Sequence, residues 1–107
     1  MQDVSTKPSI ITLCGSSRHG DEFTYWQHKL SCEGKSVFQT RYRDSQITLG
    51  KIKALLDELH LRKIDLADEV MVLDVEGYIG ETTDREIAYA RRKGKRITYL
   101  SEIFRCI

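Results

Sequence analysis

Short runs of β-branched and apolar residues alternate along the chain with longer segments in which apolar residues recur every three or four positions. The strand-like runs are residues 10–14, 36–42, 70–73 and 95–100. The segments with helical spacing are residues 21–32, 47–67 and 83–93, followed by a short helical turn at residues 101–104. Continuous or alternating apolar runs indicate strands, and a 3.6-residue period indicates amphipathic helices. The pattern therefore predicts strands that alternate with helices along the whole chain.

The predicted strands differ in how much of their surface is apolar. Val70–Leu73 is entirely apolar, which suits a central strand covered on both faces. Ser36–Tyr42 mixes polar and apolar residues in alternation, which suits an edge strand. Because strands that alternate with helices favour parallel pairing, we expect one flavodoxin/Rossmann-like three-layer α/β domain over residues 1–107. Its sheet would hold about four parallel strands in the order 2-1-3-4, with right-handed crossovers and helices on both faces.

In this strand order the topological switch lies between the first and third strands, where open α/β sheets bind ligands. The loop after the first strand contains Gly15, Ser16, Ser17 and Arg18, a set suited to a phosphate or carboxylate. A second set, Gly80, Thr82 and Thr83, follows the third strand. Glycine and serine also form ordinary turns, which is the competing interpretation for either loop alone. Two such loops at one switch point favour ligand binding.

Two titratable residues are candidates for chemistry near these loops. Thr83 and Glu86 have the spacing of a capping box, which predicts a helix start at Thr83 and gives Glu86 a purely structural role. Alternatively, a carboxylate near a helix N-terminus can attack an electrophilic carbon, as in glycosyl transfer through a covalent intermediate. His60 is a candidate general acid or base, because the reference pKa of histidine is about 6.5. A solvated or core-edge histidine is the competing interpretation of His60.

The composition limits the classes of partner and the cellular compartment that we expect for this chain. The chain has 17 Lys and Arg against 16 Asp and Glu, so a net charge of +1 gives no field suited to a nucleic acid polymer. The odd set of Cys14, Cys32 and Cys106, without C-x-x-C spacing, argues against a metal site and a secreted disulfide framework. Residues 1–8 lack a signal-peptide core, and no apolar run reaches membrane-spanning length. We expect a cytoplasmic protein without membrane contact or cofactor, and with a small-molecule ligand.

Three stretches together resemble the nucleoside 2-deoxyribosyltransferase superfamily, which includes the deoxynucleoside 5′-monophosphate N-glycosidases. The stretches are residues 13–18, residues 67–73 and residues 80–88 with Gly94-Lys95 behind them, so the resemblance spans about Ile10 to Leu100. It implies that Glu86 is the nucleophile at the anomeric carbon and that Gly15, Ser16 and Arg18 cradle a 5′-phosphate. It also implies a homodimer or larger homo-oligomer in which neighbouring subunits complete the site.

The chain departs from that family's pattern at several places. His60 stands where an aspartate usually helps to protonate the leaving base, and Thr12 replaces a tyrosine of the hydrolases. We expect the C-terminal extension that contributes substrate contacts in this family to be largely absent, because the sequence stops at Ile107. The first hypothesis is an N-glycosidic bond hydrolase or transferase acting on nucleosides or nucleotides. The alternatives are a non-catalytic module that binds or sequesters a nucleotide signal, and a small interaction domain with an empty crevice.

Overall fold

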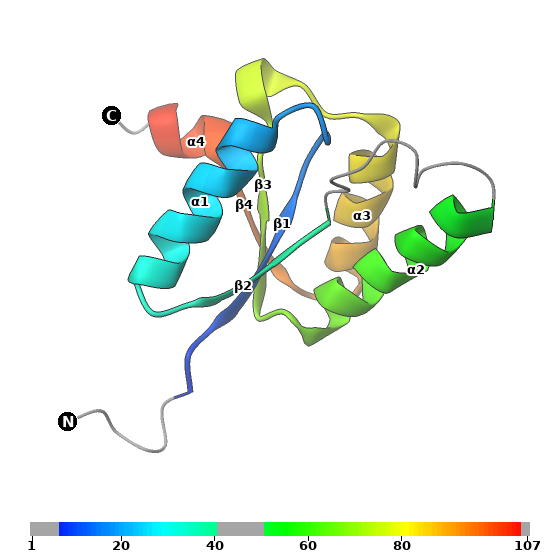
Figure 1. The fold of residues 1–107 in the computed structure, drawn as a ribbon, viewed down its shortest axis with the longest axis horizontal. Helices are drawn as coiled ribbons and strands as arrows, with labels where there is room; N and C mark the ends of the chain where they lie inside the picture. Colours follow the sequence, from blue (N-terminus) through cyan, green and yellow to red (C-terminus); the bar gives the residue numbers. More distant parts are fainter. Residues whose placement is uncertain (1–6, 41–50, 106–107) are drawn as a thin grey trace.

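The structure, a computed structural model, describes residues 7–40 and 51–105. The described strands are β1 (Ile10–Cys14), β2 (Ser36–Gln39), β3 (Glu69–Val72) and β4 (Arg96–Tyr99). They form a four-stranded sheet of parallel pairs in the order β2-β1-β3-β4 (Figure 1). The α/β class and the predicted 2-1-3-4 order are therefore confirmed. The ends of two predicted elements, residues 41–42 and 47–50, lie outside the described residues.

Two helical layers enclose the sheet (Figure 1). The helices α1 (Gly20–Cys32) and α4 (Leu100–Arg105) lie on one face. The helices α2 (Lys51–Leu66) and α3 (Glu81–Arg92) lie on the other, and the short 3-10 helix η2 (Val75–Gly77) follows β3. This confirms the three-layer arrangement with helices on both faces. None of the helices in the described ranges is long and apolar enough to cross a membrane.

Period-two alternation along the central strands produces two separate cores. Ile11 and Leu13 of β1 pack with α1 and α4, whereas Cys14 packs with the α2 and α3 side. Both faces of β1 are thus buried, as a central parallel strand requires. The one hydroxyl on this strand, Thr12, is fully buried and donates to the carbonyl oxygen of Lys63 at 2.8 Å. This bond ties the C-terminal part of α2 to the sheet.

The start of α3 corrects the capping-box prediction. The helix begins at Glu81, with Gly80 in an extended conformation at the N-cap position and no side-chain cap. Thr83 is the third helical residue and is 3% exposed, so it packs inside the fold and does not cap the helix. Glu86 consequently lies in the second turn, where its side chain meets neighbouring elements. The end of α3 agrees with prediction, because Gly94 takes a φ of 71° directly after the C-cap residue Lys93.

Candidate functional site

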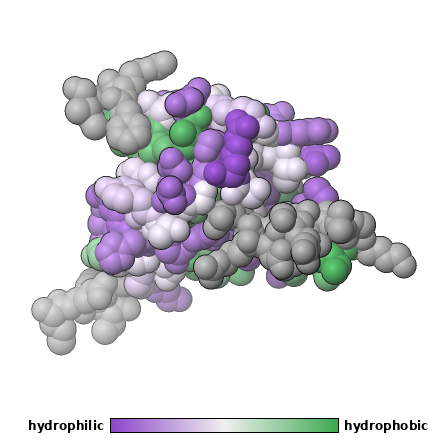
Figure 2. Space-filling view, turned by 45° about the horizontal axis from the view of Figure 1, so that its top comes forward, coloured by the Kyte–Doolittle hydropathy of each residue, from purple (hydrophilic) through white to green (hydrophobic). Residues whose placement is uncertain are grey.

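A cavity of about 300 Å³ lies at the carboxyl edge of the sheet, between the loops that leave β1 and β3. The first loop contributes Gly15, Ser16 and Ser17 to the cavity wall. The segment that opens α3 contributes Gly80, Glu81, Thr82 and Thr83. Figure 2, which turns this edge forward, shows mostly hydrophilic or neutral surface with small hydrophobic areas. The two loops selected by the strand order therefore border one polar cavity.

Gly15 allows the first loop to lie against the end of β3. A Cβ atom at this position would be 3.2 Å from the Leu73 carbonyl oxygen and 3.3 Å from the Leu73 Cβ atom. Contacts this short are tighter than most Cβ contacts, and one of the partners here is backbone. Glycine removes the conflict by having no side chain. The residue thus serves first to bring the two loops together, which is the ordinary structural role of a turn glycine.

Glu86 forms the floor of the cavity and is 5% exposed. Its Oε1 atom accepts a hydrogen bond of 3.3 Å from the Thr40 hydroxyl, directly after β2. Its Oε2 atom lies 3.4 Å from Nδ1 of His60, a buried residue of α2. The carboxylate is therefore engaged by two other elements and does not cap its own helix. This geometry removes the structural explanation that the capping-box spacing offered for Glu86.

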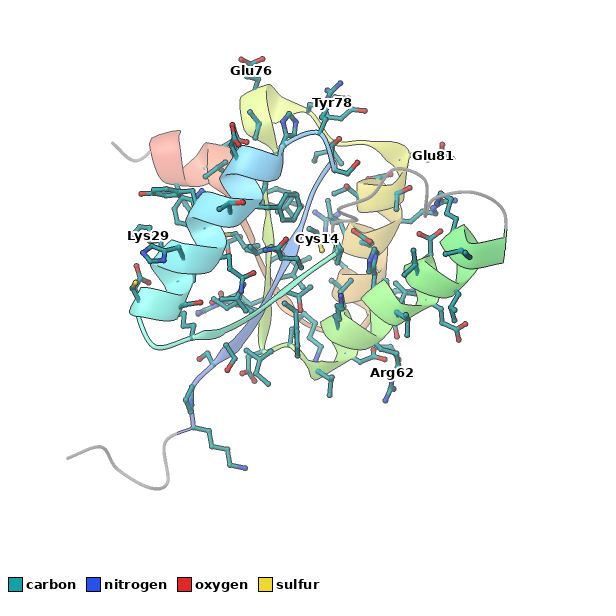
Figure 3. All side chains as sticks on the ribbon, viewed as in Figure 1. Cys14, Lys29, Arg62, Glu76, Tyr78 and Glu81 are labelled. Atoms are coloured by element: carbon teal, nitrogen blue, oxygen red, sulfur yellow. The ribbon has the colours of Figure 1, made fainter. Side chains whose placement is uncertain are left out.

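Cys14, labelled in Figure 3, is fully buried and interacts with Glu86 and Thr40. Burial raises the pKa of the Cys14 thiol well above its usual range, and the negative charge of Glu86 raises this pKa further. A hydrogen bond with Thr40 lowers the pKa of this thiol, but by less than burial raises it. The thiol therefore stays protonated at neutral pH. It is a neutral neighbour of Glu86 and is not a nucleophile of its own.

The cations near the cavity are arranged differently from the expectation. Arg18 is exposed, and its guanidinium lies 3.7 Å from the centre of the Tyr78 ring, outside the cavity lining. Tyr78 itself lines the cavity, so Arg18 lies at its rim. Among the lysines and arginines of the described ranges, Lys53 of α2 lines the cavity. Its ammonium forms a 2.8 Å ion pair with Asp57.

Of the sequence-predicted site residues, eight share this cavity and Arg18 lies at its rim. The eight are Gly15, Ser16, Ser17, His60, Gly80, Thr82, Thr83 and Glu86. Thr40, Lys53, Tyr78 and Glu81 also line the cavity without having been predicted as site residues. No signal in the sequence singled out Thr40, because the predicted strand at residues 36–42 includes it, whereas β2 ends at Gln39. In the described part of the chain, no group of three or more His, Cys, Asp and Glu residues is arranged to hold a metal ion.

No protein-family model and no curated protein matches this chain. The class of protein that the fold and cavity define is a Rossmann-like α/β domain with a buried carboxylate at its topological switch point.

Proposed function

We propose that the chain is an N-glycosidic bond hydrolase or transferase of the nucleoside 2-deoxyribosyltransferase type, acting on nucleosides or nucleotides through Glu86. One observation carries the proposal. The Glu86 carboxylate lies at the floor of a polar cavity, between Thr40 and His60 and below two loops rich in glycine and hydroxyls. A fixed carboxylate in such a cavity suits a reaction with an oxocarbenium-like transition state.

The reaction would proceed in two displacements. A Glu86 oxygen attacks the anomeric carbon while the carbon–nitrogen bond breaks, and its electron pair leaves with the base. His60 supplies the proton that the departing nitrogen takes up. Water, or a second base, then attacks the same carbon and gives up a proton to the now neutral His60, which breaks the glycosyl ester and regenerates both the carboxylate and the protonated histidine. Two inversions at the anomeric carbon give net retention of configuration.

A phosphate on the substrate would bind at the side of the cavity opposite the base. The hydroxyls of Ser16 and Ser17 and the ammonium of Lys53 are suited to phosphate oxygens. Arg18 contributes from the rim, where its stacking on Tyr78 holds that ring against the cavity. On this proposal Lys53 provides the charge inside the cavity that the sequence had suggested for Arg18.

The test measures base release by chromatography from deoxynucleoside 5′-monophosphates, alone and with a second free base as acceptor. Glu86→Gln is expected to reduce release at least about 100-fold, because the amide cannot form the glycosyl ester. Asp84→Asn is the matched control, since it makes the same change at an exposed position of α3 outside the cavity lining. Release that is absent in the wild type, or equal in the wild type and Glu86→Gln, would refute the proposal.

A non-catalytic nucleotide-binding module is the second candidate, and one observation favours it. The Glu86 carboxylate already has Thr40 and His60 as partners, which reduces its availability as a nucleophile. Under this alternative, calorimetry with the same nucleotides gives an affinity that survives Glu86→Gln and falls at least about tenfold in Lys53→Ala. Base release by the wild type would rule this alternative out.

A further inference from the structure

A groove of about 970 Å³ lies between α1, η2 and α4, on the face of the sheet opposite α2 and α3 (Figure 1). Its lining residues come from the ranges 21–29, 74–77 and 100–103, and we call it the α1–α4 groove. No described residue lines both this groove and the cavity that holds Glu86. Its volume is near the upper end of the roughly 300–1,000 Å³ typical of small-molecule sites, so the groove is a candidate for a second ligand.

The walls of the α1–α4 groove are largely apolar. Tyr25 and Trp26 of α1 contact one another edge to face, with 5.3 Å between their ring centroids. The Tyr25 ring is 58% exposed, so much of its surface is open to a ligand. Val75 and Ile103 pack against the same core as Trp26 and line the groove from η2 and α4. The groove therefore offers aromatic and aliphatic surface to an apolar body.

Three carboxylates lie at one end of this apolar groove. Asp21 and Glu22 are in the first turn of α1, one turn before the rings of Tyr25 and Trp26. Glu76 of η2 is exposed, and Figure 3 shows it above the start of α1. Within the described ranges, none of these three carboxylates forms an ion pair or accepts a hydrogen bond. Their combined charge at the end of an apolar groove favours a cation.

The other charged groups of the lining do not offset these carboxylates. Among the described lining residues, Lys29 is the only lysine or arginine, and it lies two turns further along α1. Its ammonium is 5.9 Å from the centre of the Trp26 ring and pairs with Glu33 at 2.8 Å. The fourth carboxylate, Asp74, already accepts two hydrogen bonds from Ser101. An anionic ligand would thus meet unpaired negative charge, which argues against a nucleotide in this groove.

We propose that the α1–α4 groove binds a small organic cation that joins an ammonium group to an aromatic or aliphatic body. The ammonium lies among Asp21, Glu22 and Glu76, where it forms charge-assisted hydrogen bonds. The apolar body lies against Tyr25 and Trp26. Because the groove and the cavity share no described lining residue, this inference is independent of the proposed glycosyl chemistry.

Dansylcadaverine is a suitable probe, because it joins a naphthalene ring system to a primary ammonium through an alkyl chain. With about 23 non-hydrogen atoms, it is expected to bind with a dissociation constant of about 10 µM. The analogue with a hydroxyl in place of the amine keeps the apolar body and should bind at least about tenfold more weakly. NMR titration of the isotope-labelled full chain locates the probe, since Trp26 is the only tryptophan and gives a single indole N–H signal.

The titration has outcomes that overturn the proposal. One is an amine that does not bind at concentrations up to about 1 mM, which is far above the expected dissociation constant. Another is a Trp26 indole signal that does not move when the probe saturates the protein. Equal or tighter binding of the hydroxyl analogue would show that the groove takes a neutral apolar ligand and would refute the assignment of a cation.

A double variant tests the charged end of the groove. Glu22→Gln/Glu76→Gln is expected to raise the dissociation constant of dansylcadaverine at least about fivefold, with Asp21 still in place, and to leave that of the hydroxyl analogue unchanged. Glu58→Gln/Asp84→Asn is the matched control, because it removes the same charge from exposed positions of α2 and α3 outside the groove. It should keep the wild-type affinity. Equal losses in the two double variants would mean that overall charge attracts the probe, and would refute the assignment to the groove.

A tyrosine variant tests the apolar end. Tyr25→Ser should weaken both dansylcadaverine and its hydroxyl analogue at least about fivefold, because both compounds contain the ring system that packs on Tyr25. Tyr78→Ser is the matched control, since Tyr78 is a 43% exposed tyrosine that lines the cavity of Glu86 instead. A loss of affinity in Tyr78→Ser equal to or larger than that in Tyr25→Ser would place the probe in that cavity and overturn the proposal.

Discussion

Glu86 is buried where three elements meet, and its burial is unfavourable for stability unless its oxygens are bonded. Thr40 donates to one oxygen, while His60 lies beside the other. Cys14 completes the surroundings as a neutral thiol. An apolar residue of similar size would fill this position at lower free-energy cost. On the proposed function, the cost of burying this carboxylate is offset by ligand chemistry and not by a contribution to folding.

The raised pKa of Cys14 predicts a specific loss of stability at alkaline pH. The unfolded thiol deprotonates near its reference pKa of about 8.5, whereas the folded thiol remains protonated. The unfolded state then binds fewer protons, so the free energy of unfolding falls as pH rises, by at most about 1.4 kcal/mol per pH unit. Cys14→Ala should lose this part of the slope, measured by urea unfolding at pH 7.5 and 9.5. Equal pH slopes for the two proteins would contradict the prediction.

At the scale of elements, periodicity predicted most of the fold and local spacing misplaced one helix start. The spacing of apolar residues in β1, β3 and α2 reflects which side of each element is buried, and this spacing is visible in the sequence. The start of α3 depends instead on long-range contacts. Thr83 and Glu86 satisfy a local capping pattern, but burial of Thr83 and the bond from Thr40 to Glu86 direct both side chains inward. Sequence spacing alone cannot weigh those distant partners.

The short helix α4 depends on a carboxylate from another element. Asp74, at the N-cap position of η2, is 6% exposed and accepts hydrogen bonds from the backbone N–H of Ser101 at 2.9 Å and from its hydroxyl at 2.6 Å. Asp74→Ala removes this cap and is expected to lower the free energy of unfolding by about 1–2 kcal/mol. Urea unfolding measures the change, with exposed Asp84→Ala expected within about 0.5 kcal/mol of wild type. An Asp74→Ala protein as stable as that control would show that the cap contributes little.

At the scale of the whole molecule, the site joins residues that are far apart in the sequence. Strand order was sufficient to bring Ser16 and Thr82 to one cavity, because loops at a topological switch share one edge. Lys53 could not be predicted in this way. Its position depends on how α2 crosses the sheet edge, and no strand register determines that crossing. The placement of Arg18 on Tyr78 likewise depends on a contact between two loops.

This arrangement predicts that a ligand in the cavity stabilises the whole fold. The bordering loops leave β1 and β3, which each pair with strands on both sides, so the cavity is lost when the sheet unfolds. A nucleotide at 100 times its dissociation constant should add about 2.7 kcal/mol and raise the melting temperature by roughly 10 °C. A deoxynucleoside 5′-monophosphate series in a Glu86→Gln background avoids turnover, with scanning calorimetry as the measurement. At the same nucleotide concentrations, a tenfold weaker Lys53→Ala should lose about half of the shift, whereas exposed Lys93→Ala should keep it. Equal shifts in the two lysine variants would mean that the anion binds elsewhere, because only Lys53 of the pair lines the cavity.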